Sequence, residues 1–378
     1  MVHRTLLALI FSFAFIACSD SPVDPLPFEE ESTENHDEES FQAPTPFDFA
    51  TTAPWYPCPE DPLDSKVIEV EALSEIYQYF GEENHRTVET NIQFPEGTFA
   101  QAGLFFELTC PQGGCDHWDR AGSLELILNP DAPEDDQEVV EILRHITPYR
   151  MGMCQFVDIT ALLPLLKGTR GIRSFIDTWV GPGHSDGEGW LVSLRFAFFP
   201  ISSSGNTDFP ETEEGAGPQK VINIWERHNI TVGQLDPDQN IASQVEPFQF
   251  TLPPDFERVE AHLTTTGHSF GNTHNCAEFC AMLHVLDVNG ENFTTNPWRG
   301  DCAENPVSPQ AGTWRHNRNG WCPGAVALGD VIDITTAVES GENILDFDIL
   351  LDNGRQYDNR SPVDLLPYTI VSLKLYVF

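Results

Sequence analysis

Alternation of apolar and polar residues with a period of two is the feature that most constrains the fold of this chain. It occurs in VSLRFAF at 192–198, in ILDFDIL at 344–350 and in VSLKLYV at 371–377. Successive side chains of a β-strand point to opposite faces of its sheet. The pattern therefore predicts antiparallel strands that are buried on one face and exposed on the other.

Turn signals separate these strands at short intervals. Asn289-Gly290 and Asn353-Gly354 are dipeptides typical of tight hairpin turns. Helical spacing of apolar residues is scarce, and its clearest example, ITALLPLLKG at 159–168, predicts one short helix that ends at its glycine. Short strands separated by frequent turns indicate an all-β protein of the sandwich or jelly-roll type.

Two stretches poor in apolar residues divide the chain. Residues 19–63 are predicted to form a disordered tether, because Ser19–Pro57 holds ten acids, prolines and serines, and no Lys or Arg. Residues 204–217, within SSSGNTDFPETEEGAGPQ, form a predicted linker. Two antiparallel β-sandwich domains are expected, at 64–203 and 218–378. Clefts between domains are common ligand sites.

The first 18 residues have the features of a signal peptide. A short basic start precedes an apolar run at 6–17 that is too short to span a membrane. FIAC followed by Ser19 resembles the lipobox of bacterial lipoproteins, although Phe15 stands where Leu is usual. This resemblance implies lipidation of Cys18 and an outer-membrane or cell-surface lipoprotein that touches the membrane only through its lipid. The alternative is a periplasmic or secreted protein from which Cys18 is removed.

The charge balance excludes several classes of partner. Lys and Arg number 19 and Asp and Glu number 59, which gives a net charge of -40. Such a surface repels nucleic acid and anionic membranes. We draw no catalytic conclusion from the acidity, because it also serves solubility.

Nine cysteines occur, and eight remain after Cys18. An exported chain favours disulfides. The close spacing of Cys110 with Cys115 and of Cys276 with Cys280 favours local pairs. A zinc ion bound by these four thiolates is the alternative.

Three short stretches combine an acid with an aromatic residue: CDHWDR at 115–120, FIDTWVGPG at 175–183 and NCAEFC at 275–280. In the third, Glu278 lies between two cysteines. A disulfide loop this small removes little chain entropy, so its expected role is to fix the direction of the acid.

These stretches, with HITPYRMG between the first two and the segment from Cys302 to NGWCPG after them, resemble the peptide-N-glycosidase F family in order and spacing over nearly all of 70–378. The resemblance implies two tandem jelly rolls packed side by side. It also implies an amidase that hydrolyses the bond between N-acetylglucosamine and asparagine in N-linked glycoproteins or glycopeptides. We expect a monomer that needs no metal or other cofactor.

The resemblance also assigns roles by position. Asp119, Asp177 and Glu278 match the family's essential acids. The residues that match substrate-binding positions are Arg120, Arg318, Trp118, Trp179, Trp321 and His268. The implied disulfides are Cys110–Cys115, Cys276–Cys280 and Cys302–Cys322, which leaves Cys58 to pair with Cys154.

Amide hydrolysis requires these types of residue. A carboxylate such as Asp119 can activate water, a partly protonated Glu278 can position a second water or donate a proton, and Arg120 or Arg318 can stabilise developing negative charge. Tryptophan faces suit the apolar face of a pyranose ring, although a place in the core is the commoner fate of a tryptophan.

Three departures from the family pattern bear on specificity. Asp177 stands where the family has Glu, Phe279 replaces a Trp, and TTTGHSF at 264–270 lacks another. Two alternatives stay open: an endo-acting glycosidase with paired acids, and a lipid-anchored glycan-binding protein without turnover. A copper monooxygenase of similar fold is disfavoured, because no His-x-His motif occurs.

Overall fold

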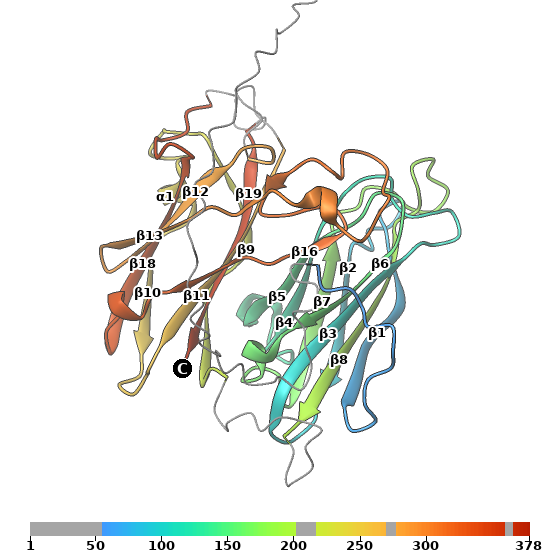
Figure 1. The fold of residues 1–378 in the computed structure, drawn as a ribbon, viewed down its shortest axis with the longest axis horizontal. Coiled ribbons are helices and arrows are strands. Elements are labelled where there is room, and N and C mark those ends of the chain that lie inside the picture. The colour runs from blue at the N-terminus through green and yellow to red at the C-terminus, as the bar shows by residue number, and fades with distance from the viewer. Residues whose placement is uncertain (1–54, 202–216, 270–276, 360–365) are drawn as a thin grey trace, which may run out of the picture. The chain divides into compact units, whose positions relative to one another are not determined.

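Antiparallel strands make up nearly all regular structure in the computed structural model, which describes residues 55–201, 217–269, 277–359 and 366–378 (Figure 1). In this part of the chain the only α-helix is α1 (Ile241–Gln244), and no helix is long and apolar enough to cross a membrane. The short 3-10 turns are η1 (Glu134–Asp136), η2 (Thr160–Leu162), η3 (Cys302–Glu304) and η4 (Thr335–Ala337). The predicted leader with Cys18, most of the predicted tether and nearly all of the predicted linker lie outside the described residues. The prediction of disorder is wrong for 55–63, where Trp55 is buried and Cys58 is bonded to Cys154.

Two sheets pack face to face to form what we call the first sandwich. One has the strand order β1 (Ile68–Gln78), β8 (Trp190–Pro200), β3 (Phe99–Thr109), β6 (Met153–Asp158). The other has the order β16 (Ala325–Ala327), β5 (Val139–Ile146), β4 (Ala121–Ile127), β7 (Thr169–Ile176), β2 (Thr87–Gln93). Leu104 and Phe196 of one sheet share a buried cluster with Leu124 and Ile172 of the other.

A second sandwich is built from later residues. Its sheets have the orders β17 (Asp330–Asp333), β11 (Val259–His268), β19 (Tyr368–Val377), β9 (Lys220–Thr231), and β10 (Phe248–Leu252), β18 (Gly341–Leu351), β12 (Met282–Val288), β13 (Glu291–Thr295). Leu263 and Leu373 pack in one cluster with Leu286 and Phe347 of the facing sheet. A small ladder pairs β14 (Trp298–Arg299) with β15 (Arg318–Asn319).

These sheets confirm the all-β class and its antiparallel sandwiches, while the jelly-roll connectivity and the domain limits stay predictions. The alternation in 192–198 and 344–350 is also confirmed, because the apolar residues of both segments point into the two clusters. The expected half-exposure of 371–377 is wrong. Every residue of that segment is buried, including Ser372 and Lys374 on the face turned away from the cluster of the second sandwich.

Contacts between the two sandwiches explain this burial. The short strand β16 comes from the later part of the chain yet pairs with β5 in the first sandwich (Figure 1). Arg144 of β5 donates to the backbone oxygens of Thr264 at 3.1 Å and Ile370 at 2.6 Å, and to Ser372 Oγ at 3.2 Å. Its charge is balanced by Glu141, whose carboxylate accepts from Arg144 Nε at 2.9 Å.

Disulfides join Cys58 with Cys154, Cys110 with Cys115, and Cys302 with Cys322, which are three of the four predicted pairs. Cys280 is also disulfide-bonded, and its predicted partner Cys276 lies outside the described residues. The alternative of a four-thiolate zinc site is therefore wrong. The bonds fit an oxidising compartment outside the cytoplasm.

The predicted helix at 159–168 is wrong beyond its first turn. The structure has only the single 3-10 turn η2 there, followed by turns up to Gly168. The Thr160 hydroxyl accepts from the backbone N–H of Ala102 at 3.1 Å, which ties the turn to β3. Pro164 also removes a backbone donor that a helix would require.

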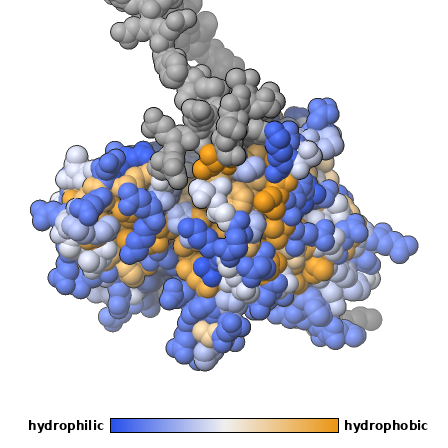
Figure 2. Space-filling view, turned by 90° about the horizontal axis from the view of Figure 1, so that it is seen from below, coloured by the Kyte–Doolittle hydropathy of each residue, from blue (hydrophilic) through white to orange (hydrophobic). Residues whose placement is uncertain are grey.

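Hydrophilic residues cover the margins of the face shown in Figure 2, and hydrophobic residues gather toward its middle. Among the described residues, the large hydrophobic side chains that stay exposed are Ile68, Trp118, Trp179, Leu235, Val331 and Ile344. Two of these are tryptophans that the sequence places next to candidate acids.

Candidate functional site

The loop that carries CDHWDR is organised around Asp116. This side chain is fully buried, and its carboxylate accepts from the Trp118 backbone N–H at 3.0 Å, from Thr178 Oγ1 at 2.7 Å and from Arg120 Nε at 2.7 Å. The disulfide holds Cys110 and Cys115 with a Cα–Cα distance of 4.4 Å at the start of the loop. Covalent and hydrogen-bonding constraints together fix the backbone that precedes Asp119.

This arrangement gives Arg120 a role within the loop, and its role in substrate binding stays a prediction. Its guanidinium pairs with Asp116, and among the influences that lower the pKa of Asp119 it is the weakest. The Asp116 carboxylate accepts hydrogen bonds from both Nε and Nη2 of Arg120, so the pair stabilises the conformation of the loop.

Arg318 brings the two principal acids together. Its Nε donates to Glu278 Oε1 at 3.1 Å, and its Nη2 lies 3.4 Å from Asp119 Oδ2. Nη2 also donates to Thr313 Oγ1 at 2.8 Å and lies 3.5 Å from the hydroxyl of Tyr149. We call these five residues the Arg318 cluster. Asp119 and Tyr149 come from loops of the first sandwich, whereas the other three come from the later part of the chain.

Close backbone packing places Glu278 in this cluster. A Cβ on Gly267 would lie 1.9 Å from the carbonyl oxygen of Ala277, so only glycine allows β11 to approach the segment before Glu278. The backbone N–H of Asn319 donates to the Glu278 carbonyl at 2.9 Å. The retained Gly267 of TTTGHSF thus has a packing role.

Burial shifts the protonation of both acids. It raises the pKa of Glu278 to about 7, with a further rise from the negative charge of Asp119 and a partial offset from Arg318. Burial also raises the pKa of Asp119, while Arg318 and the Tyr149 hydroxyl act in the opposite direction. The side chains of Asp119 and Glu278 keep 13% and 17% of their surface exposed, so water can reach them. With a pKa of about 7, Glu278 is therefore partly protonated near neutral pH.

Asp177 lies apart from the Arg318 cluster. Among the described residues its ion-pair partner is Arg86, at 3.0 Å, and no hydrogen bond or ion pair joins it to Asp119, Glu278 or Arg318. The guanidinium of Arg86 lies 4.5 Å from the ring centre of Trp179. The charges of Asp177 and Glu278 both raise the pKa of Tyr368. Both acids therefore lie near Tyr368, although they do not contact each other.

The three predicted tryptophans divide into two kinds. Trp118 and Trp179 are 55% and 52% exposed, which is compatible with stacking on a sugar. Trp321 is only 2% exposed, its Nε1 donates to the Gly267 carbonyl at 2.6 Å, and Arg318 lies 4.7 Å from its ring centre. The prediction that Trp321 offers a face to substrate is therefore wrong, because the ring is packed behind Arg318.

His268 requires the same correction. It is 8% exposed and stacked between Trp321 and Tyr368, with centroid distances of 5.3 Å to each. Burial lowers its pKa to about 3, so the ring is neutral. It supports the wall behind Arg318 and does not face solvent.

Sequence reasoning missed Tyr149, Thr313 and Arg86. Tyr149 lies in the HITPYRMG stretch that carried part of the family resemblance, so that stretch held a signal for it. Thr313 and Arg86 had no such signal. No group of three or more His, Cys, Asp or Glu in the described part of the chain is arranged to hold a metal ion.

Parts of this chain are similar to known proteins. The family model described as "Peptide-N-glycosidase F, C terminal" matches residues 237–363. Peptide-N(4)-(N-acetyl-beta-D-glucosaminyl)asparagine amidase F of Elizabethkingia miricola is 25% identical over 289 residues, which cover 72% of this chain and 74% of that protein. The chain is therefore similar to the peptide-N-glycosidase F family, most directly in residues 237–363.

Solved structures support the family fold. The structure of PNGase F, described as a glycosylasparaginase from Flavobacterium meningosepticum, has a TM-score of 0.66 at 19% identity and covers 82% of this chain and 95% of its own. PNGF-II has a TM-score of 0.62 at 18% identity, covering 83% of this chain and 66% of its own. Residues 237–363, which match the peptide-N-glycosidase F model, contain Glu278 and Arg318, whereas Asp119 lies before them.

Proposed function

We propose that the protein hydrolyses the amide between the innermost N-acetylglucosamine and asparagine of N-linked glycoproteins or glycopeptides. Water adds to the amide carbonyl carbon, the carbon–nitrogen bond breaks, and the nitrogen leaves with a proton as a glycosylamine. Asparagine becomes aspartate. The observation that carries the proposal is the shared contact of Arg318 with Asp119 and Glu278, in a chain related to an amidase.

The two acids are suited to different steps. Asp119, whose pKa Arg318 and the Tyr149 hydroxyl lower against the effect of burial, is assigned the role of base that takes a proton from water. Glu278, with a pKa of about 7, is assigned the role of proton donor to the departing nitrogen. Their environments differ, because the charge of Asp119 raises the pKa of Glu278, whereas Arg318 and the Tyr149 hydroxyl lower that of Asp119.

Arg318 fixes geometry and charge in this scheme. Its side chain is fully buried and its Nη1 donates to the carbonyls of Thr313 at 3.0 Å and His316 at 2.6 Å. A guanidinium held at this many points cannot follow the substrate, so it offers a preorganised positive charge. Trp118 and Trp179 are the aromatic faces available to the sugar.

Incubation of a denatured N-glycoprotein with the protein, followed by peptide mass spectrometry, tests the proposal. The expected product is a sugar-free peptide with Asp at the former glycosylation site. A peptide with Asn bearing one N-acetylglucosamine would show an endo-acting glycosidase, and unchanged glycopeptide that co-purifies with the protein would show binding without turnover. Either of these two results contradicts the proposal.

A further inference from the structure

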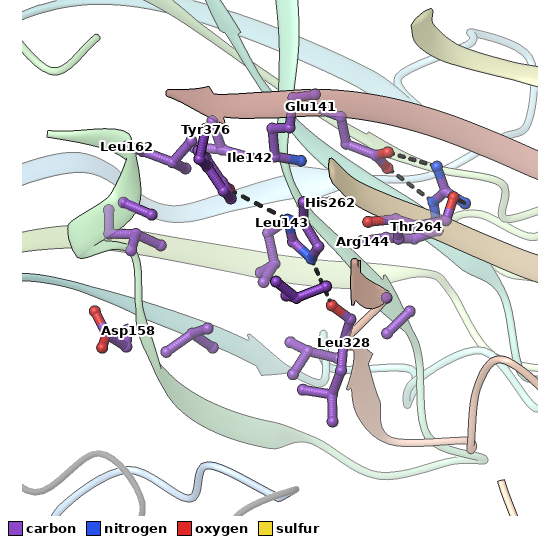
Figure 3. A pocket seen from close by; sticks show the side chains of 18 of the residues that line it. Glu141, Ile142, Leu143, Arg144, Asp158, Leu162, His262, Thr264, Leu328 and Tyr376 are labelled. Atoms are coloured by element: carbon purple, nitrogen blue, oxygen red, sulfur yellow. Dashed lines mark hydrogen bonds and ion pairs between the residues drawn. The ribbon is translucent and has the colours of Figure 1, made fainter. Parts of the chain in front are cut away.

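A cavity lies between the two sandwiches, and no residue of the Arg318 cluster lines it. Its volume is about 380 Å³, which is within the size range of small-molecule sites. Most of its wall is apolar and includes Ile142, Leu143, Leu162 and Val326 (Figure 3). It takes residues from β5 and β6 of the first sandwich and from β11 and β19 of the second.

Most polar groups on the wall of this cavity are already satisfied. Glu141 is paired with Arg144 and also accepts from Ser372, and Figure 3 shows the first of these contacts on one side of the cavity. His262 lies between the Tyr376 hydroxyl at 3.2 Å and the Leu328 carbonyl at 2.8 Å. Because the carbonyl can only accept, His262 donates from Nε2 and accepts from Tyr376 at Nδ1. None of these groups has an unmet charge.

Lys374 is different. It lines the same cavity and is only 4% exposed. Its ammonium forms no hydrogen bond or ion pair with any residue in the part of the chain that the structure describes. Burial lowers its pKa to about 8, with Glu141 partly opposing and Arg144 reinforcing that effect. The charge of Glu141 is already paired with Arg144, so it compensates the buried ammonium of Lys374 only in part, and a site of this kind favours an anionic guest.

The remaining ionised group on the lining, Asp158, does not fill that need. It is an exposed residue at the end of β6, and its carboxylate accepts from the Thr160 backbone N–H at 2.8 Å. In the view of Figure 3 it lies away from the Glu141–Arg144 pair. In the buried part of the cavity, two cations, Arg144 and Lys374, therefore share one acid, Glu141, beside an apolar wall.

We propose that this cavity binds a small monocarboxylate with an apolar body, whose carboxylate pairs with the Lys374 ammonium. One ammonium balances a single negative charge, which favours a carboxylate over a phosphate dianion. The apolar wall packs against the apolar body of the ligand, because burial of each methylene is favourable by about 0.8 kcal/mol. The site lies outside the proposed amidase machinery, and its ligand is not the proposed substrate.

Straight-chain acids provide the test. Acetate, butanoate and hexanoate are titrated into the full-length protein by calorimetry at pH 7, and thermal unfolding is followed in parallel. Affinity should rise by roughly fourfold per methylene while the chain still fits, and hexanoate should raise Tm in a saturable way. Hexanamide, which has the same body without the charge, should bind about tenfold more weakly or worse.

Two variants and one control assign the site. Lys374→Met should lower hexanoate affinity by about tenfold or more, while leaving the apo protein as stable as the wild type or more stable. Ala161→Phe, which narrows the cavity without altering Lys374, should also weaken binding. Lys220→Met, at an exposed position of β9, should change neither quantity. No saturable binding of any acid, or an unchanged affinity in Lys374→Met, would overturn the proposal.

Discussion

Arg318 and Glu278 form an ion pair at 3.1 Å in which the guanidinium is fully buried and the carboxylate side chain keeps 17% of its surface exposed. The same guanidinium lies 3.4 Å from Asp119, so one cation serves two acids from different parts of the chain. Two carboxylates near a single positive charge cannot both stay ionised without cost. This competition is the physical basis for assigning them different tasks.

Replacement of Asp119 by Asn should remove turnover while leaving glycopeptide binding. The amide keeps the size and polarity of the side chain but cannot accept a proton from water, so the loss is in the transition state. We expect kcat to fall by about 10²-fold or more, with little change in the dissociation constant. Retention of a tenth of wild-type turnover would show that Asp119 is not the base.

Asp116→Asn is the matched control in the same loop. Asp116 is fully buried and paired with Arg120, so its neutralisation should lower the free energy of unfolding by about 3 kcal/mol. Denaturant unfolding measures this loss. Turnover per folded molecule should fall far less than in Asp119→Asn, and equal losses in the two variants would contradict the separate roles.

The activity should fall as pH rises through about 7, because Glu278 must carry a proton to donate it and its pKa is about 7. In Glu278→Gln this limb should disappear together with most of the turnover. A pH–rate profile of kcat/KM measures both. An unchanged alkaline limb in that variant would assign the limb to another group.

The same shift predicts a change in stability. The folded protein holds the Glu278 proton up to about pH 7, whereas the unfolded chain releases it near the ordinary value of 4.5. The folded state binds more protons in this window, so the contribution of Glu278 to the free energy of unfolding is lost as pH rises from about 4.5 to about 7. Glu278→Gln should remove that part of the pH dependence, as measured by urea unfolding at pH 5 and pH 8.

At position 177, a longer acidic side chain should be tolerated better than a neutral side chain. Asp177→Glu should keep or raise kcat/KM, since a carboxylate remains to meet Arg86. Asp177→Asn should lower it by about tenfold, the equivalent of one charge-assisted hydrogen bond. If Asp177→Glu loses activity with its fold intact, the surroundings of Asp177 have adapted to the shorter side chain.

Exposed and buried tryptophans should respond differently to removal. Trp118→Ala should raise KM roughly fivefold with little change in stability, because one stacking face contributes about 1 kcal/mol. Trp321→Ala should instead lower the free energy of unfolding by about 3 kcal/mol, since its ring is buried. Steady-state kinetics and denaturant unfolding of both variants separate the sugar platform from the core.

Local pattern was enough to predict much of the fold. The alternation in 192–198 and 344–350 depends on each strand's own two faces, and both segments are strands with the expected faces buried. The complete burial of 371–377 depends on Arg144 and the other residues of the first sandwich that pack on it. No feature within the segment indicates that contact.

The sequence likewise predicted only part of the candidate site. The family resemblance indicated Asp119, Glu278 and Arg318, and the structure brings these three together. It did not distinguish the exposed Trp118 from the buried Trp321, because burial depends on which side of Arg318 the ring occupies. Thr313 reaches the cluster from a separate loop, and only the fold reveals its contact with Arg318.

Hydrolysis of a defined N-glycopeptide in H₂¹⁸O tests the central claim most directly. If the amide carbon–nitrogen bond breaks, the product peptide has Asp in place of Asn and carries one ¹⁸O in that carboxylate, and Asp119→Asn forms it at a rate lower by about 10²-fold or more. A peptide that retains Asn, with ¹⁸O found in the released sugar, would show cleavage at the glycosyl carbon or between sugars and would contradict the proposed amidase.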